Sequence, residues 1–322
     1  MINYNLHLIE DIYNAEKIPM RDGYGNGILE AAKRDGEVVA LVADLTDSLK
    51  LEAFKKEYPG RFWEMGIQEQ NMMGVAAGMA ASGKVPFVNS FACFNPGRNW
   101  EQLRVAVCLS RNNVKVIGGH SGFGNGVDGT NQQSFEDLAI TRVIPNLVVV
   151  APVDSEQARK ATIAIAEYIG PVYMRITKPA RPVVTSRITP FEIGKAQVMR
   201  EGKDITLAAC GAMVYEALEA AENLKDRVDV EVINVHTIKP MDVQTLVRSV
   251  KKTGRIITAE EHSIIGGLGG AVAEVLGEHM PVPMLRMGMK DRFGESGDPG
   301  DLLEKYGLSS EEMEKNILKM LD

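Results

Sequence analysis

The chain has 322 residues, of which 45% are hydrophobic and 25% charged, and its formal net charge is −7. This length accommodates two domains with their own cores, since domains mostly contain roughly 100–200 residues. The acidic balance argues against nucleic acid or an anionic membrane as partner. Neither a signal peptide nor a run approaching the roughly 20 apolar residues of a membrane helix is evident, so we expect a cytoplasmic protein.

Short β-branched runs alternate with longer amphipathic stretches along the first half of the chain. In chain order, the pattern predicts helices at 27–36, 68–83, 97–110, 135–141 and 154–168, and strands at 37–45, 85–91, 114–119, 147–153 and 172–176. The strands are apolar on both faces, which is typical of a parallel sheet covered by helices.

A segment with three prolines, residues 178–190, interrupts this alternation and predicts a domain boundary, with one domain at 1–185 and a second at 186–322. A second alternation follows. It predicts strands at 204–211, 228–235, 255–261 and 282–288, and helices at 214–224, 242–252, 268–279 and 309–321. The fold class is therefore α/β, with two domains that each contain a mainly parallel sheet covered by helices.

Glu69 stands where a short strand-like run, residues 61–66, gives way to a helix. The ordinary interpretation is a solvated glutamate in a first helical turn. However, residues 72–81 are almost all apolar or small, so we expect both faces of this helix to be buried and its start to lie at the carboxyl end of a strand. A carboxylate with little water there has its charged form disfavoured, which suits sharing a proton with a ring nitrogen.

Phe91 and Phe94 come just after the strand at 85–91. They are either core aromatics or, as an i, i+3 pair, the walls of a slot for a heteroaromatic ring. His120 lies in the glycine-rich residues 118–133, together with Asp128 and Gln132. These glycines are explained by turn chemistry alone, but the crowding of polar side chains favours a pocket for a hydroxylated ligand.

Four cationic residues are candidates for binding an anionic substrate group, although most such side chains are simply solvated: Arg21, Arg98, Arg175 and Lys178. In the second domain, His236 and His262 each follow a strand. A metal site at His262 with Glu260 and Glu261 is disfavoured, because no second ligand pair has suitable spacing. We therefore expect no metal ligand in this chain. Residues 266–270 are expected to open a helix whose N–H groups face a loop or an anion.

Three long segments, residues 66–94, 119–157 and 258–276, resemble the C-terminal section of a split transketolase, and the resemblance extends from about Met20 to the end. It implies a pyrimidine-binding domain, a C-terminal domain and thiamine diphosphate as cofactor. The reaction implied is transfer of a two-carbon ketol unit from a ketose (phosphate) donor to an aldose (phosphate) acceptor, with the cofactor supplying the chemistry.

The resemblance also implies roles for individual residues. Glu69 matches the glutamate that hydrogen-bonds N1′ of the cofactor, and His120 matches a histidine near the donor sugar; these two are the catalytic candidates. The remaining matches are Phe91 and Phe94 around the pyrimidine, Asp44 near the cofactor at the subunit interface, Asp128 and Gln132 near the sugar, and Arg21 and Arg175 at a sugar phosphate.

Two features depart from the family pattern. Where the family reads G-E-D-G-x-T-H-Q, Val127 replaces the glutamate and Gln132 the second histidine, so donor or acceptor preference can differ. The G-D-G…Asn motif that holds Mg²⁺ and the diphosphate is absent. We therefore expect the chain to be inactive alone and to form a heterotetramer with an N-terminal subunit that carries those ligands.

Three alternatives remain open: a 2-oxo-acid dehydrogenase β subunit, a deoxyxylulose-phosphate-synthase-like enzyme, and a non-catalytic regulatory or assembly module. The presence of His120, Asp128 and Arg175 favours sugars as substrates. Glu69 and the phenylalanine pair argue against a non-catalytic module, because folding alone requires neither.

Overall fold

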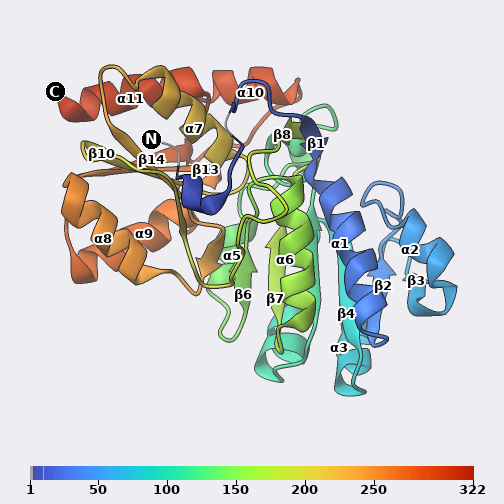
Figure 1. Cartoon of the computed structure of the whole chain (residues 1–322). Helices are drawn as coiled ribbons and strands as arrows, with labels where there is room; N and C mark the ends of the chain where they lie inside the picture. The colour runs from blue at the N-terminus through green and yellow to red at the C-terminus, as the bar shows by residue number, and fades with distance from the viewer. Residues whose placement is uncertain (1–2, 10) are drawn as a thin grey trace.

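The structure, a computed structural model, describes residues 3–9 and 11–322 and contains two α/β domains side by side (Figure 1). The larger sheet has seven strands in the order β12-β6-β7-β5-β4-β2-β3. Its parallel members are β2 (Val38–Val42), β3 (Phe62–Glu64), β4 (Val85–Phe91), β5 (Lys115–Gly119), β6 (Val148–Val150) and β7 (Val172–Arg175). The predicted fold class is confirmed.

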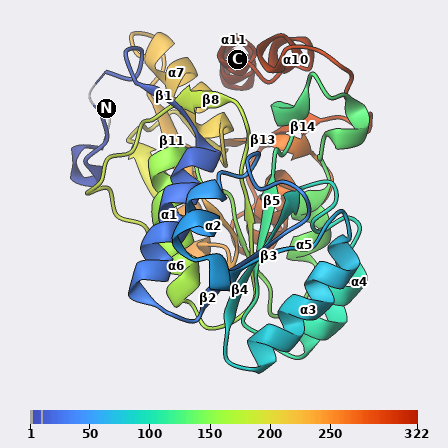
Figure 2. The same ribbon diagram turned by 90° about the vertical axis from the view of Figure 1, so that its right-hand side faces the viewer.

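The side chains of β2 alternate between the two faces of this sheet. Val39 and Leu41 pack with α3 (Glu69–Ala81) and the π-helical segment η3 (Leu103–Leu109). Val38, Ala40 and Val42 pack on the opposite face with α1 (Met20–Arg34) and α6 (Ser155–Glu167). Figure 2 shows α1 and α6 on one side of the sheet and α3 on the other. The sheet is therefore covered on both faces, as its apolar strands predict.

Two glycines permit the close approach of α1 to α6. A Cβ at Gly23 would lie 1.8 Å from the Ser155 carbonyl oxygen, and one at Gly27 would lie 2.7 Å from the Arg159 carbonyl oxygen. The expectation that this helix begins at residue 27 is wrong, because the glycine-rich start is helical and the glycines serve packing.

Asp154 begins α6, as expected, and also fastens the segment that leads to the second domain. Its carboxylate accepts the Gln157 N–H at 2.8 Å, which is the N-cap bond. It also accepts the N–H groups of Val184 and Thr185 and the Thr185 hydroxyl, at 2.9, 2.7 and 2.7 Å. These four hydrogen bonds compensate for the complete burial of the carboxylate.

The second sheet has the order β14-β13-β10-β11-β9. Its parallel strands are β10 (Ile205–Ala209), β11 (Val230–Asn234), β13 (Ile256–Ser263) and β14 (Met284–Met289), and β9 (Gln197–Arg200) is antiparallel. Its helices are α7 (Met213–Asn223), α8 (Val243–Thr253), α9 (Leu268–His279), α10 (Pro299–Lys305) and α11 (Ser310–Leu321). The four predicted strands and four predicted helices are present, whereas β9 and α10 were not predicted.

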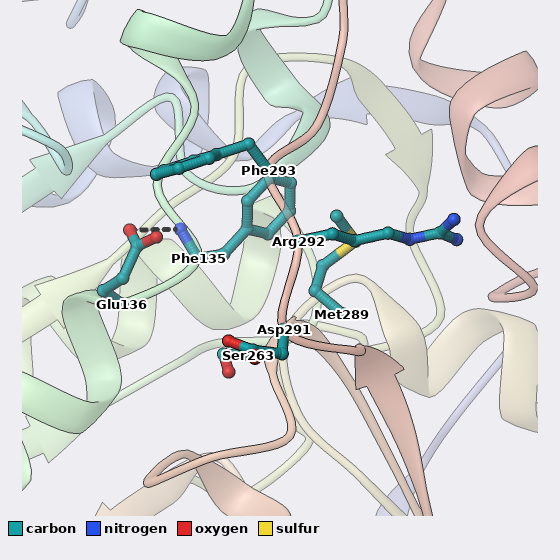
Figure 3. A pocket seen from close by; sticks show the side chains of 7 residues that line it. All are labelled: Phe135, Glu136, Ser263, Met289, Asp291, Arg292 and Phe293. Atoms are coloured by element: carbon teal, nitrogen blue, oxygen red, sulfur yellow. Dashed lines mark hydrogen bonds between the residues drawn. The ribbon is translucent and has the colours of Figure 1, made fainter.

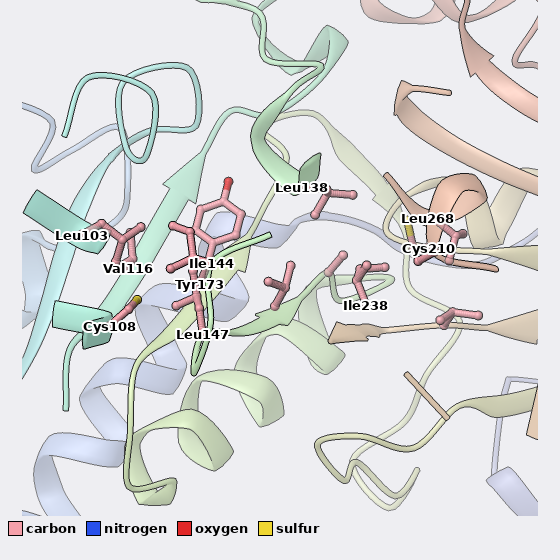
Figure 4. Close-up of a cluster of buried hydrophobic side chains, with 14 of the residues drawn as sticks. Leu103, Cys108, Val116, Leu138, Ile144, Leu147, Tyr173, Cys210, Ile238 and Leu268 are labelled. Carbon is pink, nitrogen blue, oxygen red and sulfur yellow. The ribbon is translucent and has the colours of Figure 1, made fainter. Parts of the chain in front are cut away.

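The two domains share structure across the predicted boundary. β12 (Thr237–Lys239) leaves the second domain and pairs antiparallel with β6 of the larger sheet. One hydrophobic cluster is continuous from Val116 and Tyr173 to Cys210 and Leu268 (Figure 4). Within the linker region, β8 (Ala180–Pro182) pairs with β1 (Lys17–Pro19). The second domain is therefore joined to the first by a common core as well as by the chain.

The remaining short elements are η1 (Tyr4–Leu6), α2 (Glu52–Glu57), η2 (Pro59–Arg61), α4 (Trp100–Gln102), η4 (Phe123–Asn125), η5 (Thr130–Gln132) and α5 (Asp137–Arg142). The helix expected at 97–110 is present as α4 followed by η3. The expectation that both faces of α3 are buried is not met within this chain, since Gly74 and Gly78 are exposed and a Cβ added at either would have no neighbour within 4 Å outside the adjacent helix backbone. Within the described residues, none of the helices has the length and hydropathy to cross a membrane.

Candidate functional site

Most candidate residues gather at the carboxyl edge of the larger sheet. Parallel strands end at the same edge, and Asp44, Phe91 and His120 follow or end β2, β4 and β5 there. β4 and β5 are neighbours in register, with Phe91 opposite Gly119. This register brings the rings of Phe91 and His120 to 4.3 Å between centroids.

Glu69, in the first turn of α3, is 1% exposed. The Ser90 hydroxyl donates to Glu69 Oε1 at 2.9 Å, and Arg98 Nη1 donates to Oε2 at 2.7 Å. The expected burial is confirmed. The ion pair with Arg98 was not expected and supplies a compensating positive charge.

Two buried asparagines fix the turn that follows β4. Asn95 Nδ2 donates to the carbonyls of Val88 and Ile117, at 2.9 and 3.0 Å, and so joins the turn to two strands. Asn99 donates to Asn95 Oδ1 at 2.9 Å and to the Glu69 carbonyl at 3.3 Å. Sequence reasoning missed both asparagines and Ser90, because nothing local distinguishes them from ordinary turn or strand residues.

The phenylalanine pair lies beside Glu69. The Phe91 and Phe94 rings are 6.4 Å apart at 26°, and both residues are partly exposed. The Arg98 guanidinium lies 4.4 Å from the centre of the Phe94 ring, so Arg98 contacts Phe94 and Glu69 at once. Phe91, Phe94 and Glu69 form a partly open aromatic site with a buried carboxylate, and Arg98 lies across it.

His120 is buried, and its backbone has a positive φ of 56°. Desolvation lowers its pKa to about 3, and the positive charges of Lys178 and Arg21 act in the same direction. The ring is therefore neutral at physiological pH. Its Nδ1 atom is buried without a hydrogen-bond partner, so its hydrogen-bonding capacity is unsatisfied within this chain.

The glycine-rich loop, residues 118–133, carries the other polar candidates of this region. Gln132 is half-buried, and its Oε1 atom has no partner. Asp128 is exposed, with one carboxylate oxygen 3.6 Å from Lys178 Nζ, and Val127 is 75% exposed. Arg21 Nη1 donates to the Ser48 carbonyl at 3.1 Å, whereas its Nε atom is buried and unpaired.

Arg175 does not lie open to a sugar phosphate. It is 5% exposed, and its Nε donates to Asp137 Oδ2 at 2.9 Å. Its Nη2 donates to the carbonyls of Ser134 and Glu261, at 3.2 and 2.9 Å. We correct the expectation from the resemblance accordingly: burial and internal bonds make Arg175 a link between the two domains.

Asp44 lies at the same edge of the sheet and is exposed, with a positive φ of 57°. Its N–H donates to Glu64 Oε1 at 2.7 Å, so the end of β3 holds the turn after β2. The exposed carboxylate faces away from the core of this chain.

In the second domain, the N-terminus of α9 does face an anion, and the anion is Glu260. The N–H groups of Leu268 and Gly269 donate to its carboxylate at 2.6 and 2.7 Å. Burial nevertheless raises the pKa of Glu260 to about 7. His262 is also buried; its Nε2 accepts the Ala139 N–H at 3.3 Å. Across the described part of the chain, no group of three or more His, Cys, Asp or Glu residues is placed to hold a metal.

A cavity of about 210 Å³ lies elsewhere, between the domains (Figure 3). Phe135 and Glu136 line it from the first domain, and Ser263, Met289 and residues 291–293 line it from the second. The polar groups of Glu136 and Ser263 already have partners within the protein, in the N–H groups of Phe135 and Ile265. The residues that line this cavity do not include Glu69, Phe91, Phe94 or Arg98, so the cavity is distinct from the aromatic site.

Two family profiles match the chain. "Transketolase, pyrimidine binding domain" matches residues 16–183, and "Transketolase, C-terminal domain" matches residues 194–313. The chain belongs to the transketolase family. It is 44% identical over 295 residues to the 6-deoxy-6-sulfo-D-fructose transketolase subunit SqwH of Clostridium sp. (strain MSTE9), covering 91% of this chain and 92% of the relative.

Two further similarities are to proteins described as separate subunits or split-gene products. The chain is 38% identical over 306 residues to an apulose-4-phosphate transketolase subunit of Phocaeicola vulgatus, covering 94% of this chain and 98% of the relative. A solved structure, "Split gene transketolase, inactive beta4 tetramer", superposes with a TM-score of 0.88 at 44% identity, covering 94% of this chain and 98% of that one.

The family implies thiamine diphosphate as cofactor. The residues of this chain fit its ring end, because a buried carboxylate adjoins two partly exposed aromatic rings at the edge of the sheet.

Proposed function

We propose that this chain is the C-terminal subunit of a split transketolase that transfers a two-carbon ketol unit from a ketose donor to an aldose acceptor. The observation that carries the proposal is the buried Glu69 carboxylate beside Phe91 and Phe94, with neutral His120 in contact with Phe91. A fold requires none of these features, whereas a site for a heteroaromatic cofactor requires an acid group and flat walls.

In this proposal, thiamine diphosphate supplies the carbanion chemistry and the protein orients the reactants. Glu69 holds or moves a proton at the pyrimidine nitrogen, and Ser90 fixes the carboxylate in position through Oε1. Phe91 and Phe94 would contact the pyrimidine and exclude water. Neutral His120 offers a hydrogen bond to the donor sugar without adding charge.

The donor and acceptor sugars are proposed to carry an anionic terminus. Arg21 and Lys178 place positive charge near His120, and Arg21 Nε lacks an internal partner. The two relatives are named for 6-deoxy-6-sulfo-D-fructose and apulose 4-phosphate, whose sulfonate and phosphate groups share this character. Gln132 would then bind a sugar hydroxyl through its unpaired Oε1, where the family has a histidine. Asp128, which pairs with Lys178, is the remaining candidate near the sugar.

The proposal includes a partner. The relatives are named as subunits, which supports a separate N-terminal chain that carries the ligands for the diphosphate and Mg²⁺. Exposed Asp44 would face the cofactor at this interface, and the exposed Gly74 and Gly78 side of α3 would be covered by another chain of the complex. A heterotetramer satisfies both requirements.

The test is a two-carbon transfer assay of the chain with its partner, thiamine diphosphate and Mg²⁺, using phosphorylated and sulfonated ketoses as donors. We expect activity only with both chains and a fall of roughly a hundredfold or more in Glu69→Ala. The exposed Glu101→Ala serves as the matched control and should retain activity. Decarboxylation of a 2-oxo acid in place of sugar transfer would replace the proposal with a dehydrogenase β subunit. If no substrate reacts, a non-catalytic module replaces it.

A further inference from the structure

The second domain packs against the glycine-rich loop of the first domain and forms hydrogen bonds with it. Segment 294–297, which follows β14, makes three hydrogen bonds with this loop. They run from Thr130 Oγ1 to the Gly294 carbonyl (2.8 Å), from Gln133 Nε2 to the Glu295 carbonyl (2.9 Å), and from the Gly297 N–H to the Gly126 carbonyl (3.0 Å). The contact is close, because a Cβ at Gly126 would lie 2.4 Å from the Gly297 carbonyl oxygen.

Glu261, near the end of β13, reaches the loop at its base. Its side chain is buried, and its Oε1 atom accepts the Phe123 N–H at 2.7 Å. A Cβ at Gly122 would lie 2.5 Å from the Glu261 carboxyl carbon, so the carboxylate lies directly against the loop. Gly122 has a positive φ of 58°, which a residue with a side chain rarely adopts. This contact lies only three residues after His120.

The backbone around Glu261 is itself tied to the other end of the loop. Arg175 donates from one nitrogen to the carbonyls of both Glu261 and Ser134. The Ser263 N–H donates to the Phe135 carbonyl at 2.8 Å. The Phe123 ring contacts the Phe135 ring at 4.8 Å and the Tyr306 ring of the second domain at 5.1 Å, so the loop base is packed as well as hydrogen-bonded.

A loop with six glycines in twelve residues loses much conformational entropy when it is ordered. Its internal turn bonds, such as that from the Gly126 N–H to the Phe123 carbonyl, shape the loop locally, whereas the bonds to the second domain fix its position relative to the rest of the protein. A hydrogen bond from a backbone N–H to a carboxylate is stronger than a neutral one and fixes that amide in place. We propose that the second domain is the positioning element of the glycine-rich loop, and that Glu261 is its principal positioning residue. It fixes the backbone at Phe123 so that His120 and Gln132 face the same sugar. The role of those two residues rests on the proposed function, whereas the restraint of the loop does not.

The test compares Glu261→Ala with Glu261→Gln in the full chain, because glutamine retains an oxygen that accepts the Phe123 N–H. Amide hydrogen exchange of peptides from residues 118–134 is measured first, without cofactor or sugar. We expect exchange in Glu261→Ala to rise roughly tenfold or more, as loss of a bond to a charged acceptor implies, and glutamine to restore most of the protection. Glu231→Ala is the control, since this buried carboxylate of the same sheet is bonded within the second domain by Thr206 at 3.1 Å.

The second readout is steady-state kinetics of the assembled complex. We expect Glu261→Ala to raise KM for the ketose donor roughly tenfold or more, with thiamine diphosphate affinity changed less than about threefold. The inference is overturned if the loop amides of a folded Glu261→Ala chain exchange at the wild-type rate. It is also overturned if the loop amides of Glu261→Gln exchange as fast as those of Glu261→Ala. If Glu261→Ala does not fold, Thr130→Val, which removes only the bond to Gly294, must raise exchange at 129–133. If the wild-type complex transfers no two-carbon unit, the proposed function is refuted. The exchange data still show whether the second domain restrains the loop.

Discussion

Arg98 contacts both Glu69 and Phe94, which the proposed cofactor site would use. Its removal should lower the stability of the unliganded chain and strengthen cofactor binding. Its Nη1 atom pairs with Glu69 Oε2 at 2.7 Å, and its guanidinium lies 4.4 Å from the Phe94 ring centre. The Arg98 side chain is 44% exposed, whereas Glu69 is almost fully buried. Arg98 is therefore the contact of Glu69 that is most readily displaced when a ring enters.

The size of the effect follows from these two contacts. Discounted for the 44% exposure of Arg98, the ion pair contributes at most about 1 kcal/mol, and a cation–π contact at an exposed site contributes about 0.5–1 kcal/mol, so Arg98→Met should lose about 1.5 kcal/mol. An unfolding entropy of roughly 2.1 cal/mol/K per residue gives about 0.7 kcal/mol/K for a chain of 322 residues. The unliganded chain should then melt about 2 °C lower.

In the wild type, cofactor binding must displace Arg98 from Glu69 and so loses the free energy of these two contacts. The Arg98→Met variant has no such contacts to lose, so it should bind the cofactor more tightly. About 1.4 kcal/mol corresponds to a factor of ten, and thiamine diphosphate should bind the assembled Arg98→Met complex about tenfold more tightly. Melting is followed by differential scanning fluorimetry, and binding by cofactor titration with circular dichroism. Arg104→Met, an exposed arginine on η3, is the control and should change neither quantity. Weaker cofactor binding in Arg98→Met would refute the reasoning, because Arg98 would then stabilise the bound state.

Three further predictions concern buried polar groups. Asp154→Ala should lower the free energy of unfolding by roughly 3 kcal/mol or more in urea titrations, because it removes an N-cap and leaves three further donors without an acceptor. Asp154→Asn should lose less stability, and equal stability of the two variants would contradict this. Burial lowers the pKa of His236 to about 3, so the unfolded chain takes up its proton first as the pH falls below about 6.5 and stability is lost towards acid pH. His236→Gln should therefore lose stability less steeply between pH 6 and 5, by about 1.4 kcal/mol per pH unit, and parallel curves would exclude a neutral buried His236. Gln132→Leu should lower kcat/KM for the ketose roughly tenfold or more while cofactor affinity stays unchanged, and an unaffected kcat/KM would remove Gln132 from the site.

The position of Phe91 and His120 at one edge of the sheet could be predicted because each stands at the end of a strand. Phe91 ends β4 and His120 follows β5, and parallel strands place both at one edge whatever their order. Adjacent pairing of β4 and β5, which the sequence does not specify, then sets the ring contact between them. The buried carboxylate of Glu69 was predictable from the apolar character of the helix it begins.

The two arginines show what local sequence does not determine. Arg98 and Arg175 were equal candidates for an anion, but the partner of each is set by tertiary contacts. Arg175 meets Asp137 on α5 and is buried between domains, whereas Arg98 meets Glu69 and stays half-exposed. The short strand β12 was missed for a related reason, since a strand of three residues has no periodicity to detect and exists because β6 offers it a free edge.

The most direct test of the proposed function concerns Glu69 as the residue that moves a proton on the cofactor. The measurement is the rate at which the C2 proton of thiamine diphosphate exchanges with D₂O in the assembled complex, for the wild type and Glu69→Gln, with cofactor binding verified separately. We predict that exchange is slower in the variant by roughly a hundredfold or more while the cofactor remains bound. Exchange at the wild-type rate in a fully loaded Glu69→Gln complex would contradict this role of Glu69.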